Sequence, residues 1–329
     1  MTKIGFCFDI AENHPLYQKR DENTAEYESE QTINWMAGVL EEMGEVIRLP
    51  WHKDIFLDFK KHKPDVVFNI TESWGSRNRE SFVPNICEIL NIPYTGSDGL
   101  ALAASLDKAM TKQIVQSLGI ATPGFFKIKS VENLPALLAE YDLDFPLFVK
   151  PNNEGSSIGI EKTACTENKE ELEQEIQKTI TRYQESVLVE EFMPGREFTV
   201  SLLGNDKPRV FPVAEILTGG GEFDFYSYEY KEQHDKIIKC PVDISSKAKN
   251  MMINASLAIF EALECRDLAR VDFKMDPQGD PAFIEINPLP GLSPYYSIYP
   301  KQAEKENMSS KQIIKKLISF AQQRGAESF

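Results

Sequence analysis

The sequence predicts an α/β protein of three units whose C-terminal part is α+β. Its 329 residues are enough for two or three domains at about 100–200 residues each. Near the N-terminus, a buried strand, an amphipathic helix and a second buried strand follow one another, which favours a parallel α/β unit. After about residue 190 the chain is richer in strands. We therefore expect units at 1–98, 99–190 and 191–329.

The first unit is expected to open with an apolar strand at 4–8. Ser29 suits an N-cap, and apolar residues recur at helical spacing from Ile33 to Met43, until Gly44 ends the pattern. A second buried strand follows at 65–70, and a short strand at 93–97 runs into a turn. The first boundary is therefore placed near residue 98.

The second and third units differ in how strands and helices are distributed. The second unit is expected to hold helices at 107–118 and 172–183 and strands at 145–150, 159–162 and 187–192. The third is expected to hold strands at 197–203, 209–217, 270–275 and 282–286 and helices at about 247–264 and 309–323. The strand-rich third unit indicates an α+β ending to an α/β chain.

The composition is that of a soluble globular protein, with 42% apolar and 26% charged residues. The net charge is −15, from 36 basic and 51 acidic residues, and such a surface repels phosphate backbones, so we expect no nucleic-acid partner. No apolar run reaches the roughly 18–20 residues of a membrane helix. The first apolar stretch meets Asp9 too early for a secretory signal. We expect a cytoplasmic protein with no membrane partner.

Cysteine and histidine usage excludes several enzyme classes. The five cysteines are widely spaced and form no CxxC pair, which argues against zinc ribbons and thioredoxin-type motifs. An odd number of cysteines suits reduced thiols. The four histidines have no metal-ligand spacing, so a zinc hydrolase is not expected. No GxGxxG follows the first strand, which argues against a dinucleotide enzyme.

A loop of small residues directly follows the apolar strand that ends at Lys150. The loop reads Pro-Asn-Asn-Glu-Gly-Ser-Ser-Ile-Gly from residue 151 to 159. Its backbone N–H groups and its two hydroxyls, at Ser156 and Ser157, can face a polyphosphate, with positive charge from Lys150. It is not a Walker A loop. The alternative is a hairpin turn with a solvated lysine.

A second pattern places four polar side chains on two predicted strands. Arg270 and Asp272 share one strand face, as do Glu285 and Asn287. If the strands pair, three oxygen ligands and a guanidinium converge. Oxygen ligands without His or Cys favour magnesium, and Arg270 would face the negative charge that develops in phosphoryl or acyl transfer. The alternative is an ordinary ion pair between surface-facing strand residues.

A third pattern is the pair Glu190-Glu191 at the end of an apolar strand, followed by a turn at Pro194-Gly195. A hinge of this kind can present backbone groups to an adenine edge and a carboxylate to ribose hydroxyls. The alternative is a solvated corner of the protein, because such charge pairs beside a turn are mostly exposed.

Taken in order, these segments resemble the ATP-grasp superfamily and, within it, the D-alanine–D-alanine ligase family. The resemblance is carried by Asp107-Lys108 with Lys112, by 145–160, 188–200 and 225–231, by Arg270 to Phe273, and by 285–292. It implies a three-domain ATP-grasp fold. In this fold, an N-terminal parallel-sheet domain precedes central and C-terminal domains that clasp ATP between them.

The resemblance also implies roles for individual residues. The ATP contacts would be Lys108, Lys150, Ser157 and Lys231 near the phosphates, Glu190, Glu191 and Met193 at adenine, Glu197 at the ribose, and Phe192, Phe225 and Ile284 around the base. The metal ligands would be Asp272, Glu285 and Asn287, which would bind two Mg²⁺ (or Mn²⁺) ions.

The chemistry implied by the resemblance is an ADP-forming ligation. The γ-phosphoryl group of ATP passes to a carboxylate, and an amine attacks the resulting acylphosphate. Arg270 and the backbone N–H of Gly291 would stabilise the tetrahedral oxyanion. The loop at Ser156 and the segment 226–231 would close over the reaction and exclude water.

Four departures from the family pattern fall on amino-acid recognition or lid closure. The N-terminal Gly-Gly and Ser-x-Glu signature is replaced by residues 8–14, and the His-Gly pair after the second strand by 69–75. Glu232 replaces a tyrosine after the lid lysine, and Tyr296 replaces a serine that contacts the second substrate. Replacement substrate contacts could come from Trp74, Arg77, Arg79 and Glu80; the alternative is a solvated charged loop.

We therefore expect an ATP-dependent, ADP-forming ligase of the D-alanine–D-alanine ligase type that joins two amino acids or an amino acid and a related acid. A ligase for a different amino-acid or peptide pair in a specialised pathway is an alternative, because the departures change the substrate region. A non-catalytic ATP-binding regulator is a second alternative, although the full metal set argues against it. The resemblance also makes a homodimer through the first unit one expected assembly.

Overall fold

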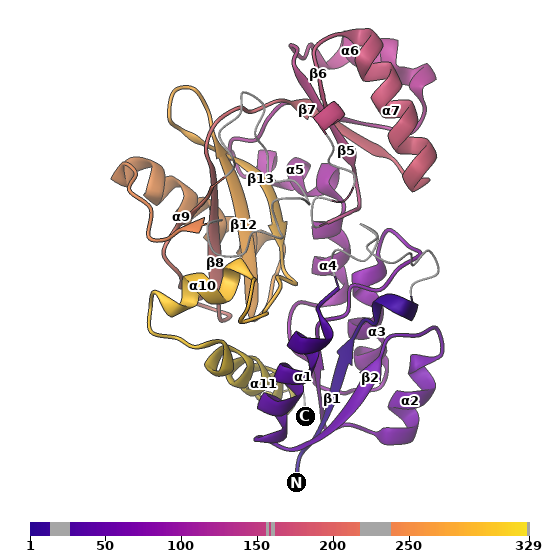
Figure 1. Cartoon of the computed structure of the whole chain (residues 1–329), viewed down its shortest axis with the longest axis vertical. Coiled ribbons are helices and arrows are strands. Elements are labelled where there is room, and N and C mark those ends of the chain that lie inside the picture. Colours follow the sequence, from indigo (N-terminus) through magenta and orange to yellow (C-terminus); the bar gives the residue numbers. More distant parts are fainter. Residues whose placement is uncertain (14–26, 156–157, 159–161, 218–237, 328–329) are drawn as a thin grey trace.

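The computed structural model describes residues 1–13, 27–155, 158, 162–217 and 238–327. Its sheets follow the predicted order, since the first is parallel and the later two are antiparallel (Figure 1). The mixed α/β fold class with an α+β ending is therefore confirmed.

The first sheet holds β1 (Lys3–Phe8), β2 (Glu45–Pro50) and β3 (Val66–Asn69) in the order β2-β1-β3. The accompanying helices are η1 (Ala11–Asn13), α1 (Glu30–Glu41), α2 (Ile55–His62), η3 (Arg79–Ser81) and α3 (Phe82–Ile89). Ser29 caps α1 as predicted, because its side chain accepts a hydrogen bond from Thr32 N at 3.2 Å. The expected strand at 93–97 is reduced to a single bridge between Tyr94 and Val67.

The last helix of the chain covers this first sheet. Helix α11 (Ser310–Glu327) packs against α1 and β3 (Figure 1). Its apolar residues Ile314, Leu317 and Ala321 share one buried cluster with Ile4 and Phe6 of β1. The N-terminal and C-terminal parts of the chain therefore share one hydrophobic core, which sets their relative position.

Two consecutive helices connect the first sheet to the second. They are α4 (Gly99–Leu106) and α5 (Lys108–Ser117). Asp107 lies between them and caps α5, accepting a hydrogen bond from Met110 N at 3.1 Å. The cap fixes the first residue of α5, Lys108, at the helix N-terminus.

The second sheet is antiparallel and runs in the order β4-β7-β5-β6. Its elements are β4 (Phe125–Ile128), η4 (Val131–Asn133), α6 (Leu134–Tyr141), β5 (Leu147–Pro151), η5 (Lys162–Ala164), β6 (Cys165–Thr166), α7 (Lys169–Tyr183) and β7 (Val187–Glu191). The strand expected at 159–162 lies mainly outside the described residues. Next to β5, the edge of this sheet is formed by the short β6.

The third sheet follows the order β11-β10-β8-β12-β13, with β9 also paired to β8. Its elements are β8 (Glu197–Leu203), β9 (Arg209–Val210), β10 (Ala214–Ile216), β11 (Ile238–Lys239), α9 (Ser246–Ala262), β12 (Leu268–Met275), β13 (Pro281–Asn287) and α10 (Ile298–Glu304). The single strand predicted at 209–217 is thus two strands. Pro212 lies in the interruption and has no N–H to donate to a sheet ladder.

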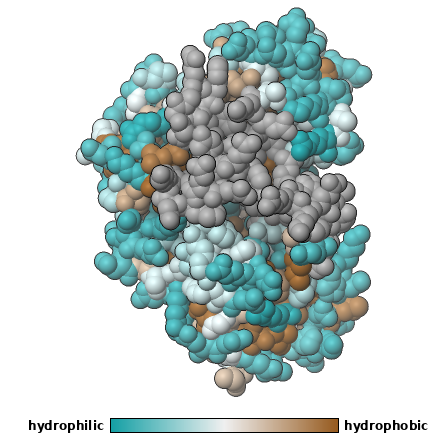
Figure 2. Space-filling view, viewed as in Figure 1, coloured by the Kyte–Doolittle hydropathy of each residue, from teal (hydrophilic) through white to brown (hydrophobic). Residues whose placement is uncertain are grey.

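The visible surface of the described residues is mostly hydrophilic, with small scattered apolar areas (Figure 2). Across the described ranges, no helix combines the length and the apolar character that crossing a membrane requires. The large apolar side chains lie mainly in the buried clusters between sheets and helices.

Candidate active site

A cavity of about 270 Å³ lies where elements of all three units meet. The cavity is lined by every described residue to which the family resemblance gives a role with ATP, the metal or the oxyanion: Lys108, Lys150, Glu190, Glu191, Phe192, Met193, Glu197, Arg270, Asp272, Ile284, Glu285, Asn287 and Gly291. Four other predicted site residues, Ser156, Ser157, Phe225 and Lys231, lie outside the described residues, as does Glu232. The fold therefore gathers in one place residues that are up to about 180 positions apart in the sequence.

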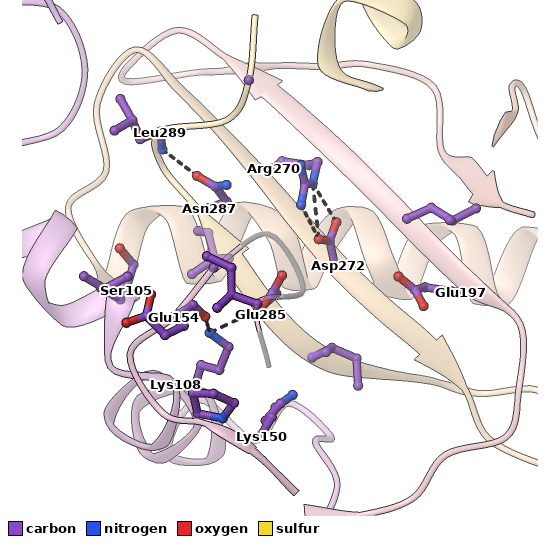
Figure 3. A pocket seen from close by; sticks show the side chains of 18 of the residues that line it. Ser105, Lys108, Lys150, Glu154, Glu197, Arg270, Asp272, Glu285, Asn287 and Leu289 are labelled. Carbon is purple, nitrogen blue, oxygen red and sulfur yellow. Dashed lines mark hydrogen bonds and ion pairs between the residues drawn. The ribbon is translucent and has the colours of Figure 1, made fainter. Parts of the chain in front are cut away.

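The polar floor of the cavity comes from β12 and β13. These strands are antiparallel neighbours in which Arg270 is opposite Asn287 and Asp272 is opposite Glu285. All four side chains therefore lie on the same face of the sheet (Figure 3). The Arg270 guanidinium donates to Asp272, with Nη2 to Oδ2 at 2.8 Å and Nε to Oδ1 at 3.0 Å. The convergence predicted from alternation is confirmed by this register.

Lys108 faces these carboxylates from the N-terminus of α5 (Figure 3). Its Nζ lies 3.8 Å from Glu285 Oε2 and also donates to the carbonyl of Glu154 in the loop after β5. Burial opposes ionisation of Glu285, but the charges of Lys108, Lys150 and Arg270 outweigh it and lower the pKa of Glu285. Glu285 is therefore an ionised carboxylate surrounded by cations.

Glu190 is held between two lysines. Lys150 Nζ lies 2.6 Å from Oε1, and Lys112 Nζ lies 2.9 Å from Oε2. The second contact is an ion pair without hydrogen-bond alignment, since Oε2 has no hydrogen-bond partner among the described residues. Burial opposes ionisation, yet the two lysines lower the pKa of Glu190 to about 2.

The strand end after Glu190 offers backbone and aromatic groups to the cavity. Glu191 exchanges backbone and side-chain hydrogen bonds with Gly124, whose N–H donates to Glu191 Oε2 at 2.8 Å. The Phe192 ring stacks on Phe148 with ring centres 6.1 Å apart. The Met193 carbonyl accepts a hydrogen bond from the ammonium group of Lys274 at 3.2 Å. The Glu191 carboxylate, the Glu191 backbone N–H and the Met193 carbonyl therefore already have partners within the protein.

Glu197 opens β8 on the same side of the cavity. Its carboxylate lies 3.9 Å from Lys274 Nζ. Burial raises the pKa of Glu197, Lys274 acts in the opposite direction, and Asp272 and Glu285 add to the increase, so that the pKa is about 7. At neutral pH this carboxyl group can both donate and accept hydrogen bonds.

The donor set at β12 and β13 fits a hard divalent cation. It consists of the two opposed carboxylates Asp272 and Glu285 and the amide of Asn287, whose Oδ1 accepts from Leu289 N at 2.8 Å. No group of three or more His, Cys, Asp or Glu suitable for a metal occurs among the residues that the structure describes. Two carboxylates and one amide would leave the remaining coordination positions to phosphate or water, as is usual for Mg²⁺.

The turn at Gly291 also lines the cavity. A Cβ at this position would lie 2.8 Å from Ser297 Oγ and 3.3 Å from Glu28 Oε1, so the glycine allows a close approach of these groups. Glu28 Oε1 also accepts from Leu292 N at 3.2 Å, and Glu28 Oε2 contacts the hydroxyl of Tyr296. Tyr296 is therefore held at the cavity wall by Glu28.

Sequence reasoning did not identify Glu28 as a cavity residue, nor its neighbours Tyr27 and Glu72, which also line the cavity. Glu28 lies in a polar stretch without periodicity, and its contacts with Leu292 and Tyr296 span more than 260 residues of sequence. The one local signal was the N-cap at Ser29, which fixes the start of the adjacent helix.

The arginines proposed as replacement substrate contacts differ in position. The side chain of Arg79 is 6% exposed; its Nη1 donates to the carbonyl of Asn153 at 2.7 Å and its Nη2 lies 3.4 Å from Glu154 Oε2. Arg77 is 66% exposed and pairs with Asp107 at 3.6 Å. Arg79 is therefore a buried support of the loop after β5, whereas Arg77 lies at the surface.

The other two candidates in this segment also differ. Trp74 packs edge-on against Trp51, with ring centres 6.1 Å apart, in the apolar cluster of the first unit. Glu80 is buried and lines the cavity. Of the four candidates, only Glu80 faces the cavity.

Comparison with known proteins gives consistent matches. A family model described as "D-ala D-ala ligase C-terminus" matches residues 114–319. The D-alanine–D-alanine ligase of Aquifex aeolicus is 36% identical over 285 residues, covering 86% of this chain and 92% of that protein. The crystal structure of the D-alanine–D-alanine ligase from Bacillus anthracis aligns over 100% of both chains with a TM-score of 0.78 and 25% identity. VanG D-Ala:D-Ser ligase from Enterococcus faecalis aligns over 97% of this chain and 99% of its own, with a TM-score of 0.71 and 25% identity.

Proposed function

Because the chain belongs to the D-alanine–D-alanine ligase family, we propose that this ATP-dependent, ADP-forming ligase joins two amino acids, or an amino acid and a related acid, in the cavity described above. The observation that supports it best is the facing arrangement of Lys108, Lys150 and Arg270 with the carboxylates of Asp272 and Glu285. Cations for phosphates and ligands for a divalent metal are thus present in one cavity.

Each of these cations now pairs with a carboxylate of the cavity. Lys108 pairs with Glu285, Lys150 with Glu190, and Arg270 with Asp272. When ATP binds, phosphate oxygens would replace the carboxylates as partners of Lys108 and Lys150, while Asp272 and Glu285 would bind the metal. Such an exchange replaces one set of charge pairs by another, so the buried charges stay compensated.

The site would hold ATP with two Mg²⁺ (or Mn²⁺) ions, bound by Asp272, Glu285 and Asn287. When bound, the metal would supply positive charge that offsets the negative charge of the phosphates. Phe192 and Ile284 would enclose the base, with the backbone of Glu191 and Met193 at its edge and Glu197 at the ribose. This assignment is supported by the presence of all these residues in the cavity lining and by the stacking of Phe192 on Phe148 just after β7.

The reaction would proceed in two steps at the Gly291 end. The substrate carboxylate attacks the γ-phosphorus, which gives an acylphosphate and ADP. The amine then attacks the acyl carbon, a proton leaves the nitrogen, and inorganic phosphate departs. Arg270 and the Gly291 N–H would stabilise the oxyanion between these events, and Ser156, which lies outside the described residues, would help to close the site.

The substrates would be small amino-acid-like molecules, and they would lie near Glu28, Glu80 and Tyr296, with Tyr296 on the side of the second substrate. The acidic surface argues against a nucleic-acid partner. A cytoplasmic location suits the demand for ATP, and a homodimer through the first unit is the proposed assembly.

Trapping of the acylphosphate tests this proposal. The protein is incubated with ATP, Mg²⁺, a panel of amino acids and hydroxylamine, which converts an acylphosphate into a hydroxamate. We expect hydroxamate and ADP in equal amounts, and the loss of both in Lys150→Met. Lys127→Met is the matched control, because Lys127 pairs with Asp107 outside the cavity lining. ADP release without hydroxamate, or equal losses in both variants, would contradict the proposed chemistry.

A further inference from the structure

Two lysines share Glu190, but only one of them reaches the cavity. Glu190 and Lys150 line the cavity, whereas Lys112 is fully buried behind them on α5 and is not among the lining residues. Lys112 also donates a hydrogen bond to Thr122 Oγ1 at 2.7 Å. It therefore cannot reach a substrate without leaving its own partners.

The surroundings of Lys112 hold it in one place. Thr122 Oγ1 in turn donates a hydrogen bond to the carbonyl oxygen of Phe283 in β13, at 2.8 Å. The ammonium also lies over the ring of Phe125 in β4, 5.6 Å from the ring centre. Helix α5 and strands β4, β7 and β13 thus meet at this one buried cation.

The charges around Lys112 do not cancel in pairs. Glu190 contacts both Lys112 and Lys150, and Glu285 of β13 acts on Lys112 from further away. Burial lowers the pKa of Lys112 to about 8, while Glu190 acts to raise it, so most of the side chain is protonated at pH 7. The local cluster of two lysines and one carboxylate therefore carries a surplus positive charge beside the cavity.

We propose that Lys112 is a positioning residue that keeps the buried charge of Glu190 compensated, and so allows Lys150 to exchange Glu190 for the phosphates of ATP. The inference rests on the proposed function, because it takes Lys150 as a phosphate ligand. Lys112 acts through Glu190 and touches no substrate.

The argument is electrostatic. If Lys150 moved to a phosphate without a second lysine present, Glu190 would remain as an uncompensated buried carboxylate, which is strongly unfavourable. Lys150 would then stay with Glu190, and ATP would bind without its full set of phosphate contacts. With Lys112 in place, Glu190 keeps one cation at 2.9 Å throughout.

The test compares ATP with adenosine, because adenosine lacks the phosphates. Calorimetry gives the dissociation constants of Mg²⁺–ATP and of adenosine for the wild type, Lys112→Met, Glu190→Gln and the double variant. We expect Lys112→Met to weaken ATP binding by about tenfold or more while adenosine binding changes by less than about twofold. In the Glu190→Gln background, removal of Lys112 should raise the dissociation constant of Mg²⁺–ATP by less than about threefold, because no buried carboxylate remains to be compensated.

Three results would overturn the inference: unchanged ATP binding in folded Lys112→Met, equal weakening of ATP and adenosine, or an undiminished cost of removing Lys112 in the Glu190→Gln background. If Lys112→Met does not fold, the comparison of Glu190→Gln with the double variant still decides, and a loss of ATP affinity well above threefold between these two would overturn the inference. A wild type that binds no ATP would refute the proposed function itself. Lys127→Met again serves as the matched control and should bind both ligands as the wild type does.

Discussion

Arg79→Ala should weaken ATP binding although Arg79 does not line the cavity. Arg79 extends from η3 of the first unit and donates to the carbonyl of Asn153, beside the ion pair with Glu154. Both partners belong to the loop that follows Lys150. Without Arg79, this loop loses a buried support, and ATP binding must itself provide the free energy that orders it.

The magnitude follows from the two contacts. A hydrogen bond from a charged donor to a buried carbonyl contributes about 1.5–3 kcal/mol. Glu154 is 26% exposed, so its ion pair at 3.4 Å is partly screened and adds less than about 1 kcal/mol. We take about 2 kcal/mol as the part of this stabilisation of the loop that ATP binding must provide in the variant. Because about 1.4 kcal/mol corresponds to a tenfold change in the dissociation constant, the affinity for ATP should fall by about 30-fold.

The matched control is Arg77→Ala. Arg77 lies two residues away in the same segment, but its side chain is 66% exposed and its ion pair with Asp107 is 3.6 Å long. We expect it to change ATP affinity by less than about threefold. Titration calorimetry with Mg²⁺–ATP measures both variants, and thermal unfolding shows that both are folded. Equal effects of the two substitutions would refute the role assigned to Arg79.

Three further predictions concern the metal ligands, the buried charges and the turn before β8. Asp272→Asn combined with Glu285→Gln should reduce Mg²⁺-dependent ADP release by about 100-fold or more, and unchanged release would disprove the metal assignment. Because the pKa of Glu190 is lowered to about 2, its ionised form contributes to the free energy of unfolding fully above about pH 4.5, and this contribution is lost as the pH falls toward 2. Urea unfolding across this pH range should therefore show a steeper loss of stability for the wild type than for Glu190→Gln. Parallel plots of stability against pH for the two proteins would contradict this prediction. Gly195→Ala should destabilise the protein by about 3 kcal/mol, because a Cβ would overlap the carbonyl of Met275; an unchanged urea midpoint would show that the turn can relax.

The parts of the site that the sequence predicted depend on short-range patterns. Alternation along a strand sets which side chains share a face, so Arg270 with Asp272 and Glu285 with Asn287 could be predicted to converge once the strands pair. The N-cap at Ser29 likewise follows from residue type and local spacing. These features require no knowledge of distant contacts.

The parts that the sequence did not predict depend on long-range contacts. Arg79 reads as a solvated or substrate-binding arginine until its contact with Asn153, 74 residues away, is known. Glu28 lies in a stretch without periodicity and becomes a cavity residue only through Leu292 and Tyr296. Lys112 carries part of the family resemblance, but its burial against Glu190 could not be deduced from spacing.

The most direct test of the account is ADP release with ATP and Mg²⁺ across D- and L-amino acids, offered singly and in pairs, with mass analysis of the products. The account predicts that ADP and phosphate appear together with a product whose mass equals that of the two substrates minus one water. D-alanine alone would give its dipeptide if Glu28 and Tyr296 form the family's usual substrate pocket, whereas a different pair would show that these residues changed the specificity. Tight ATP binding without ADP release for any pair would contradict the claim that the chain is a carboxylate–amine ligase for amino acids.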